Sequence, residues 1–383
     1  MFQTIIGTIS SFMYSKLLVI LLIGAGVYFT VRTRFPQVRL FKNACGSVME
    51  KPEDKGAISS FQALMVSTAS RVGTGNIVGV SSAICIGGFG SVFWMWVIAI
   101  IGGILAVLTG WCLLGGGSRI VKVTSMVVPV MGIAYIGISL LVVIINIQNV
   151  PAMFVRIFEE AFDFKAIFGA FSGSAMMQGI RRGLYSNEAG IGSAPNASAS
   201  ANVSHPVKQG LVQMLSVFID TLLLCTATAM MCMSSGIDPA KELQGAPWVQ
   251  ASLQESLGSF GPIFITVAMV FFAFTTLLGN CFYCDNLLIY IHKKQPEKAF
   301  MKGFRLVSAL AIFLGAGMEM SLLWDLSDVL MGVMALINIP VILILSGIAF
   351  KAIQDYEAQL KQGINPVFKS ADIDLRQKTD FWR

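Results

Sequence analysis

Apolar residues occupy most of this chain in long runs, and short polar or charged segments separate the runs. A helix of about 20 apolar residues can span the hydrocarbon core of a bilayer. The pattern therefore predicts an all-α integral membrane protein that crosses the membrane nine times. The expected crossings are residues 16–31, 57–88, 91–114, 126–147, 165–204, 209–233, 261–291, 305–318 and 322–352.

Lysine and arginine gather in alternate connections between these runs, and this predicts the orientation. A basic loop follows the first crossing, and further basic residues lie near Arg119, Lys208 and Lys293. Short loops rich in positive charge stay on the cytoplasmic side. We therefore expect an external N-terminus, a transmembrane transport domain over residues 1–353 and a cytoplasmic polar tail over residues 354–383.

The composition excludes a soluble domain. The 383 residues are 55% hydrophobic and 13% charged, and the mean hydropathy is +0.73. The net charge of +6 comes from the basic loops, so it needs no nucleic acid to explain it. The apolar runs make membrane lipid the expected partner, and no nucleic acid is expected. His205 and His292 are the only histidines, and no HExxH or His–Cys arrangement is present. We therefore expect no enzyme, no catalytic residues and no cofactor.

The second crossing contains STASRVGTGNIVGV over residues 67–80, which is unusually polar for a transmembrane segment. Gly73 and Gly75 flank Thr74, so the backbone can leave helical geometry there. Such backbone is tolerated at membrane depth only where it is buried in protein or lines a cavity. Arg71 and Asn76 add polar side chains, which favours a binding site in a broken helix. The alternative is a face of small residues for helix packing.

A second unusual stretch, GIRRGLYSNEAGIGSAPNASASA, covers residues 179–201. The Glu188 carboxylate beside Asn187 costs several kcal/mol in a membrane unless it is paired or solvated. Such a group would suit a cation or an ammonium group. The alternative places this motif at the cytoplasmic end, with Arg181 and Arg182 as ordinary positive loop residues. Another possible break, GAFSGS at residues 169–174, stays open.

A third stretch, FFAFTTLLGNCFYCDN at residues 271–286, places two adjacent hydroxyls in a long apolar helix. Threonines in helices usually bond to carbonyls of their own helix. Beside the exposed carbonyls of a broken helix, however, Thr275 and Thr276 would supply hard oxygen ligands, which suit a small alkali cation.

Together, SRVGTGNIVGV, GLYSNEAGIGSAPNA with HPVKQGL, and FTTLLGN resemble the bacterial sodium:alanine (alanine/glycine:cation) symporter family over nearly the whole chain. The resemblance implies a leucine-transporter-like fold with two inverted five-helix repeats and an extra N-terminal helix. It also implies a sodium-coupled importer of alanine or glycine in the bacterial inner membrane, working by alternating access.

The same resemblance implies a set of site residues. The N–H groups of Gly73, Thr74 and Gly75 would hold the substrate carboxylate. The carbonyls of Ala69 and Val72 would bind sodium together with the hydroxyls of Thr275 and Thr276. The remaining residues expected to line the substrate site are Asn76, Tyr185, Ser186, Asn187, Glu188 and Asn280.

The chain departs from the family pattern near Gly103. FWMWVIAIIGG runs directly into ILAVLTGWCLLGGGSRIVKV, whereas family members carry a loop and further helices between these segments. Core helix three and parts of core helices two and four are therefore expected to be missing. Both parent helices run in the same direction, so later orientations are preserved. The alternative function is accordingly a transport-inactive, internally deleted family member.

Overall fold

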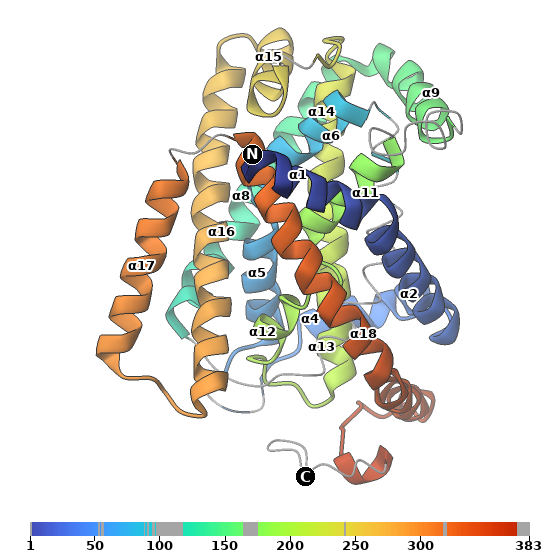
Figure 1. The fold of residues 1–383 in the computed structure, drawn as a ribbon. Coiled ribbons are helices and arrows are strands. Elements are labelled where there is room, and N and C mark those ends of the chain that lie inside the picture. The colour runs from blue at the N-terminus through green and yellow to red at the C-terminus, as the bar shows by residue number, and fades with distance from the viewer. Residues whose placement is uncertain are drawn as a thin grey trace.

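The computed structural model is a bundle of helices (Figure 1). It describes residues 2–52, 54, 57–87, 89, 92, 93, 96, 118–163, 175–240, 243–316 and 320–373. The helices are α1 (Phe2–Phe12), η1 (Met13–Leu17), α2 (Leu18–Arg32), α3 (Pro36–Arg39), α4 (Phe41–Val48), α5 (Ser60–Arg71), η2 (Gly75–Gly79), α6 (Val80–Gly87), α8 (Ser118–Ile145), η3 (Ile147–Asn149), α9 (Val150–Ala161), α11 (Ala175–Asn187), α12 (Ala194–Ser198), α13 (Pro206–Phe218), η5 (Ile219–Cys225), α14 (Thr226–Ser234), α15 (Ala246–Leu257), α16 (Phe260–His292), α17 (Lys298–Ala316), α18 (Met320–Lys361) and η7 (Ser370–Ile373).

Several helices are long and apolar enough to cross a membrane. Among the described residues there are four such helices, at Thr124–Ile145, Pro206–Ser234, Phe260–His292 and Leu322–Lys361. Each coincides closely with a run expected from the sequence. The shorter apolar helices Leu18–Arg32 and Gly75–Ile86 also overlap expected crossings. The structure thus confirms a helical protein with multiple membrane-capable segments, while nine crossings stay a prediction.

Three helices pack around α5, which lies at the centre of the bundle. α5 contacts both α8 and α16, and α13 packs against the same helix. Their shared core contains Ala69, Val72, Met131 and Phe272, all of them buried. Because α5 is central, the polar residues at its carboxyl end lie inside the protein, among α11, α13 and α16.

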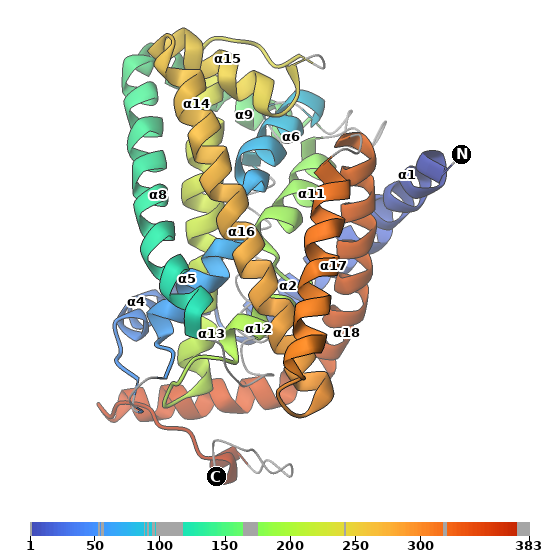
Figure 2. The ribbon, with the colours of Figure 1, turned by 90° about the vertical axis from the view of Figure 1, so that its left-hand side faces the viewer.

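The basic connections lie at one end of the bundle. Figure 2 shows the start of α8, the start of α13 and the turn between α16 and α17 at the end that also carries α4 and the C-terminus. The helix α15 lies at the opposite end (Figures 1 and 2). This arrangement supports the predicted topology because all four basic connections fall on one side.

Reporter fusions check this topology. Fusions near Lys51, Arg119, Lys208 and Lys293 should report a cytoplasmic location, and a fusion near Asp238 should report an external one, because positive loops are retained inside. Finding Lys293 and Asp238 on the same side would exclude the arrangement.

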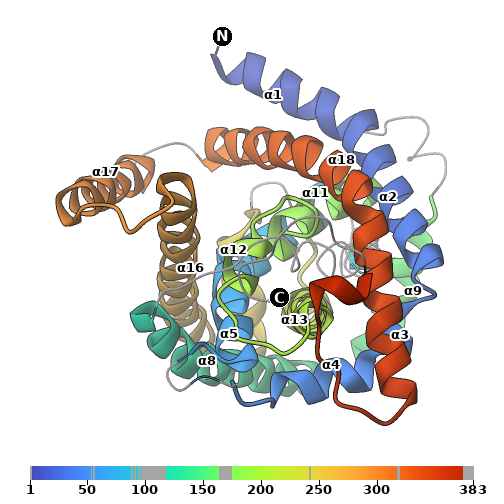
Figure 3. The ribbon, with the colours of Figure 1, turned by 90° about the horizontal axis from the view of Figure 1, so that it is seen from below.

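The polar tail predicted from residue 354 onward begins as a continuation of α18. Figures 2 and 3 show this helix turning across the lower end of the bundle. The chain beyond it folds back onto the start of α13. The N–H of Phe368 donates to the carbonyl of Ser204 at 2.9 Å, and the Lys208 ammonium donates to Asn365 at 2.7 Å and Glu50 at 2.6 Å.

His205 lies under this folded-back segment and caps α13. Its Nδ1 accepts from the N–H of Val207 at 3.1 Å, and its Nε2 lies 3.2 Å from an oxygen of Asp355. The rings of Tyr356 and Phe368 pack against it. Burial lowers the pKa of His205 from 6.5 to about 4, although Asp355 opposes the shift.

Acidification should therefore destabilise the protein through His205. The imidazole is neutral in the folded state but protonates near pH 6.5 when unfolded, so stability is full above that pH and falls toward pH 4. The expected loss between neutral pH and about pH 5 is on the order of 2 kcal/mol. Melting temperatures in detergent test this. His205→Asn can still cap the helix but cannot titrate, so an equal acid sensitivity in this variant would contradict the assignment.

Candidate functional site

The helix of the second crossing is interrupted where the glycines predict a break. α5 ends at Arg71, Val72 has a non-helical ψ of 87°, and the helix resumes as the π-helical turn η2. The Asn76 side chain folds back over the gap, because its Oδ1 accepts from the N–H of Gly73 at 2.8 Å. An amide side chain thus replaces a helix hydrogen bond lost at the break.

The helix α16 lies directly against this break. A Cβ added at Gly279 would be 2.7 Å from the nitrogen of Ser70, so the two backbones are in close contact. One turn earlier, the hydroxyl of Thr276 lies 3.4 Å from the carbonyl oxygen of Val72. The structure therefore brings together Val72 and Thr276, two of the four expected sodium ligands.

The other two expected sodium ligands differ in their surroundings. Ala69 is fully buried on the turn of α5 that precedes the break. Thr275 directs its hydroxyl to the carbonyls of Phe271 and Phe272, at 3.0 and 3.1 Å. Its hydroxyl therefore bonds within α16, as threonines in apolar helices commonly do.

A second interruption follows α11. Glu188 has a positive φ of 52°, and Gly190 and Gly192 have φ values of 85° and 91°. Left-handed backbone of this kind ends a helix and suits glycine. Asn338 of α18 donates to the carbonyl of Gly190 at 2.9 Å, which holds the loop. Of the two breaks left open by the sequence, this one is present, and residues 169–174 lie outside the described part.

Serine hydroxyls connect the two breaks. Ser70 lies 2.9 Å from Oε1 of Glu188 and 2.8 Å from Oδ1 of Asn280, and Ser193 donates to the other Glu188 oxygen at 2.7 Å. Ser70 has one proton, so it can donate to only one of these acceptors at a time. Glu188 and Asn280, predicted from separate motifs, therefore share one partner at the end of α5.

The remaining predicted residues near the break differ in how deeply they are buried. The Tyr185 ring covers Gly75, since a Cβ added there would lie 3.0 Å from two ring carbons. Asn187 is fully buried and its Oδ1 accepts from the N–H of Ala189 at 3.0 Å. Thr74, in contrast, is exposed.

A buried carboxylate that none of the three sequence motifs contains lies beside the break. Asp220 lies in η5 and is fully buried. Its Oδ1 accepts from the Asn76 amide at 2.8 Å, and its Oδ2 accepts from Ser186 at 2.7 Å and Thr221 at 3.0 Å. The one available signal was an aspartate inside an otherwise apolar run, which is itself a functional hypothesis in a membrane protein.

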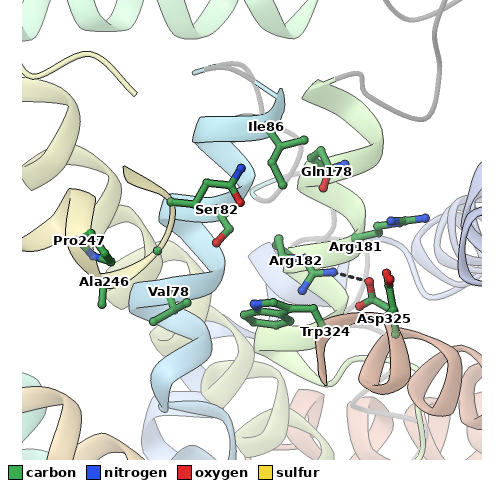
Figure 4. Close-up of a pocket in the computed structure, with 13 residues that line it drawn as sticks. Val78, Ser82, Ile86, Gln178, Arg181, Arg182, Ala246, Pro247, Trp324 and Asp325 are labelled. Carbon is green, nitrogen blue, oxygen red and sulfur yellow. Dashed lines mark hydrogen bonds and ion pairs between the residues drawn. The ribbon is translucent and has the colours of Figure 1, made fainter. Parts of the chain in front are cut away.

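A cavity of about 490 Å³ is lined by residues of η2, α6, α11, α18 and the start of α15, among them Val78, Arg182 and Trp324 (Figure 4). Trp324 lines it and packs edge-on against Tyr185, with ring centroids 4.7 Å apart. Arg182 forms a buried ion pair with Asp328 of α18 and lies over the Trp324 ring. Arg181 and Arg182 are both at least nine-tenths buried, so the interpretation of these arginines as cytoplasmic loop markers is wrong.

Comparisons with known proteins agree with this architecture. The sequence model of the sodium:alanine symporter family matches residues 1–103 and 100–370. The chain belongs to that family. The amino-acid carrier protein AlsT of Bacillus subtilis (strain 168) is 35% identical over 460 aligned positions, covering 100% of this chain and 98% of the relative.

Two further relatives indicate the range of named substrates. The sodium/alanine symporter AgcS of Methanococcus maripaludis is 31% identical, covering 94% of this chain and 99% of the relative. The probable sodium/glutamine symporter GlnT of Bacillus subtilis (strain 168) is 34% identical, covering 99% and 96%. The family consists of sodium-coupled amino-acid carriers rather than enzymes.

Proposed function

We propose that this chain is a sodium-coupled importer of a small neutral amino acid, alanine or glycine, which works by alternating access in the bacterial inner membrane. The observation that carries the proposal is the meeting of the broken helix with α16. The carbonyl of Val72 and the hydroxyl of Thr276 face each other, with their oxygens 3.4 Å apart. Hard oxygen donors of this kind suit a small alkali cation.

The substrate would bind beside the same break. Backbone N–H groups at the start of a helix favour an anion, so the N–H groups of Thr74 and Gly75 would receive the substrate carboxylate. The N–H of Gly73 would join them once Asn76 Oδ1 releases it. Tyr185, Ser186 and Asn187 would line the pocket together with Glu188, Asn76 and Asn280. The Tyr185 ring against Gly75 leaves little space there, which favours alanine or glycine over a large side chain.

We infer a leucine-transporter-like inverted-repeat fold with an extra N-terminal helix. The two interrupted helices support this, because discontinuous helices that meet near the midplane are typical of such transporters. The N-terminus would be external and the tail after residue 353 cytoplasmic, with all basic connections on the inner side.

The second candidate function is an internally deleted, transport-inactive family member. The family model matches in two segments that meet near residue 103, and AlsT aligns over 460 positions although this chain has 383 residues. These facts support the loss of core helix three with parts of core helices two and four. The junction, at residues 97–117, lies outside the described residues.

Uptake of labelled alanine tests both candidates. Proteoliposomes with the chain, or with a version whose missing helices come from a full-length relative, should accumulate alanine only when sodium is outside.

Thr276→Val removes a hydroxyl at nearly constant side-chain shape. It should therefore raise the sodium concentration for half-maximal uptake by about tenfold, which is equivalent to the loss of one ligand that contributes about 1.4 kcal/mol. Thr266→Val, at an exposed hydroxyl of the same helix, is the control.

The outcomes separate the candidates. Sodium-driven uptake by the restored version alone would identify this chain as the inactive form. Unchanged sodium dependence in Thr276→Val, and in the double variant with Thr275→Val, would exclude these hydroxyls as ligands.

A further inference from the structure

Asp220 is a buried carboxylate that the proposed sodium and substrate sites do not use. We propose that it is a proton-binding site, protonated at Oδ2, and that alanine binding at the break draws the proton onto it. The coupling to alanine rests on the proposed function, whereas the proton site itself does not.

The two oxygens of Asp220 have different kinds of partner. The orientation of the Asn76 amide is fixed, because its Oδ1 accepts from Gly73 and its Nδ2 must therefore face Asp220. Oδ1 thus meets a group that can only donate. Oδ2 instead meets the hydroxyls of Ser186 and Thr221, and a hydroxyl can either donate or accept.

A proton can therefore be taken up at Oδ2 by turning hydroxyls, without moving the backbone. In the step, a hydronium ion gives its proton to Oδ2, a new O–H bond forms and water is released. The new O–H then donates to Ser186. The Ser186 hydroxyl turns instead toward the sulfur of Cys225, which lies 3.2 Å away, so every group keeps a partner.

The contact distances favour a proton over a metal ion at this place. Oδ2 lies 2.7 Å from the Ser186 oxygen and 3.0 Å from the Thr221 oxygen, which are ordinary hydrogen-bond separations. The Asn76 amide directs its N–H at the other oxygen, and a positive hydrogen repels a cation. A proton needs no additional space between these groups.

Two other ionisable side chains act on Asp220 within the described part of the chain. The Arg71 guanidinium on α5 interacts with it electrostatically, and the Cys225 thiol lies in the same turn. The other helices that pack against η5 are α8, α11, α13, α14 and η2. From these, Asp220 receives the uncharged Ser186 of α11 and Asn76 of η2.

A short chain of hydrogen bonds links this site to the break. Asp220 holds the Asn76 amide, and Asn76 in turn holds the N–H of Gly73. A substrate carboxylate at the neighbouring N–H groups of Thr74 and Gly75 would place a second negative charge near Asp220, and like charges in a low-dielectric interior repel strongly. Protonation removes the repulsion, so alanine binding and proton uptake favour each other.

Infrared difference spectroscopy of the purified chain tests the proton site without alanine. On acidification, the native protein should show the carbonyl stretch of a protonated carboxylic acid, with slow exchange in deuterated water because Asp220 is buried. Asp220→Asn should lack this band, and Asp238→Asn, at an exposed carboxylate, should keep it. If Asp220→Asn does not fold, Thr221→Val serves instead, because it removes one partner of Oδ2 and should move the band.

Adding alanine then tests the coupling. The native chain should gain the Asp220 band on alanine addition at a pH where the alanine-free protein lacks it. A band that persists in Asp220→Asn, or an identical spectrum for native protein and both variants, would overturn the proton site. If Asp220→Asn loses bound sodium and the native protein shows no such band, Asp220 is a sodium ligand and the proton site is also overturned. An Asp220 band in a chain that binds no alanine would retain the proton site and refute the proposed function.

Discussion

Replacing Gly75 by leucine should abolish alanine binding by the folded protein. A backbone N–H can bind a carboxylate only if the two approach within about 3 Å, and a side chain at Gly75 obstructs that approach. It would also displace the Tyr185 ring, which lies 3.0 Å from the position of an added Cβ. Loss of two charge-assisted hydrogen bonds, about 3 kcal/mol, corresponds to an affinity at least ~100-fold weaker.

Equilibrium binding of labelled alanine to purified protein measures this, and the melting temperature is recorded alongside. Gly137→Leu is the matched control, because nothing lies within 4 Å of an added Cβ at that position of α8. If the glycines serve only helix packing, melting temperature and binding should fall together. Normal alanine binding by Gly75→Leu would show that the break is not the carboxylate site.

Adding a single methyl group at Gly279 should damage both stability and sodium binding. The new Cβ would lie 2.7 Å from the nitrogen and 2.9 Å from the Cα of Ser70. Both atoms belong to the backbone and cannot rotate aside, so α5 and α16 must separate. Overpacking of this kind costs about 3 kcal/mol, and the separation also moves Thr276 away from the Val72 carbonyl.

Thermal unfolding and sodium-dependent alanine binding of Gly279→Ala test this expectation. Gly303→Ala, in α17, has open space at its Cβ and should behave like the native protein in both measurements. A Gly279→Ala protein with native melting temperature and sodium dependence would mean that the close approach of the two helices is dispensable.

The sequence predicted the helical architecture well because apolar runs of membrane-spanning length are a strong signal. It also located the first interruption, at Gly73 and Gly75, and offered the second, at Gly190 and Gly192, as one of two candidate breaks. It places both Thr275 and Thr276 at the sodium site, whereas the Thr275 hydroxyl bonds to carbonyls of its own helix. Adjacent residues on a helix point about 100° apart, and the surroundings of a mostly apolar helix do not reveal its orientation.

The missed residues share a physical cause. From its own motif Arg182 can equally be a loop residue, because its partner, Asp328, lies 146 positions away on α18. Asp220 pairs with Asn76, 144 positions away. Tertiary packing alone joins these groups, so local patterns cannot identify the pairs, although an isolated charge in an apolar run does signal that a partner exists.

Because η5 joins α13 to α14, the number of residues in this segment determines how the two helices are rotated relative to each other. A π-helical turn holds more residues than an α-helical turn, and removing one residue would rotate α13 against α14 by about 100°. Gln213 on one side of η5 accepts from Ser67 at 2.5 Å, and Thr228 on the other side lies 2.8 Å from the Tyr135 hydroxyl. Both hydrogen bonds form only if α13 and α14 keep their present rotation relative to each other. A one-residue insertion or deletion here should thus be far more damaging than a substitution, because it would misalign half of an otherwise intact helix.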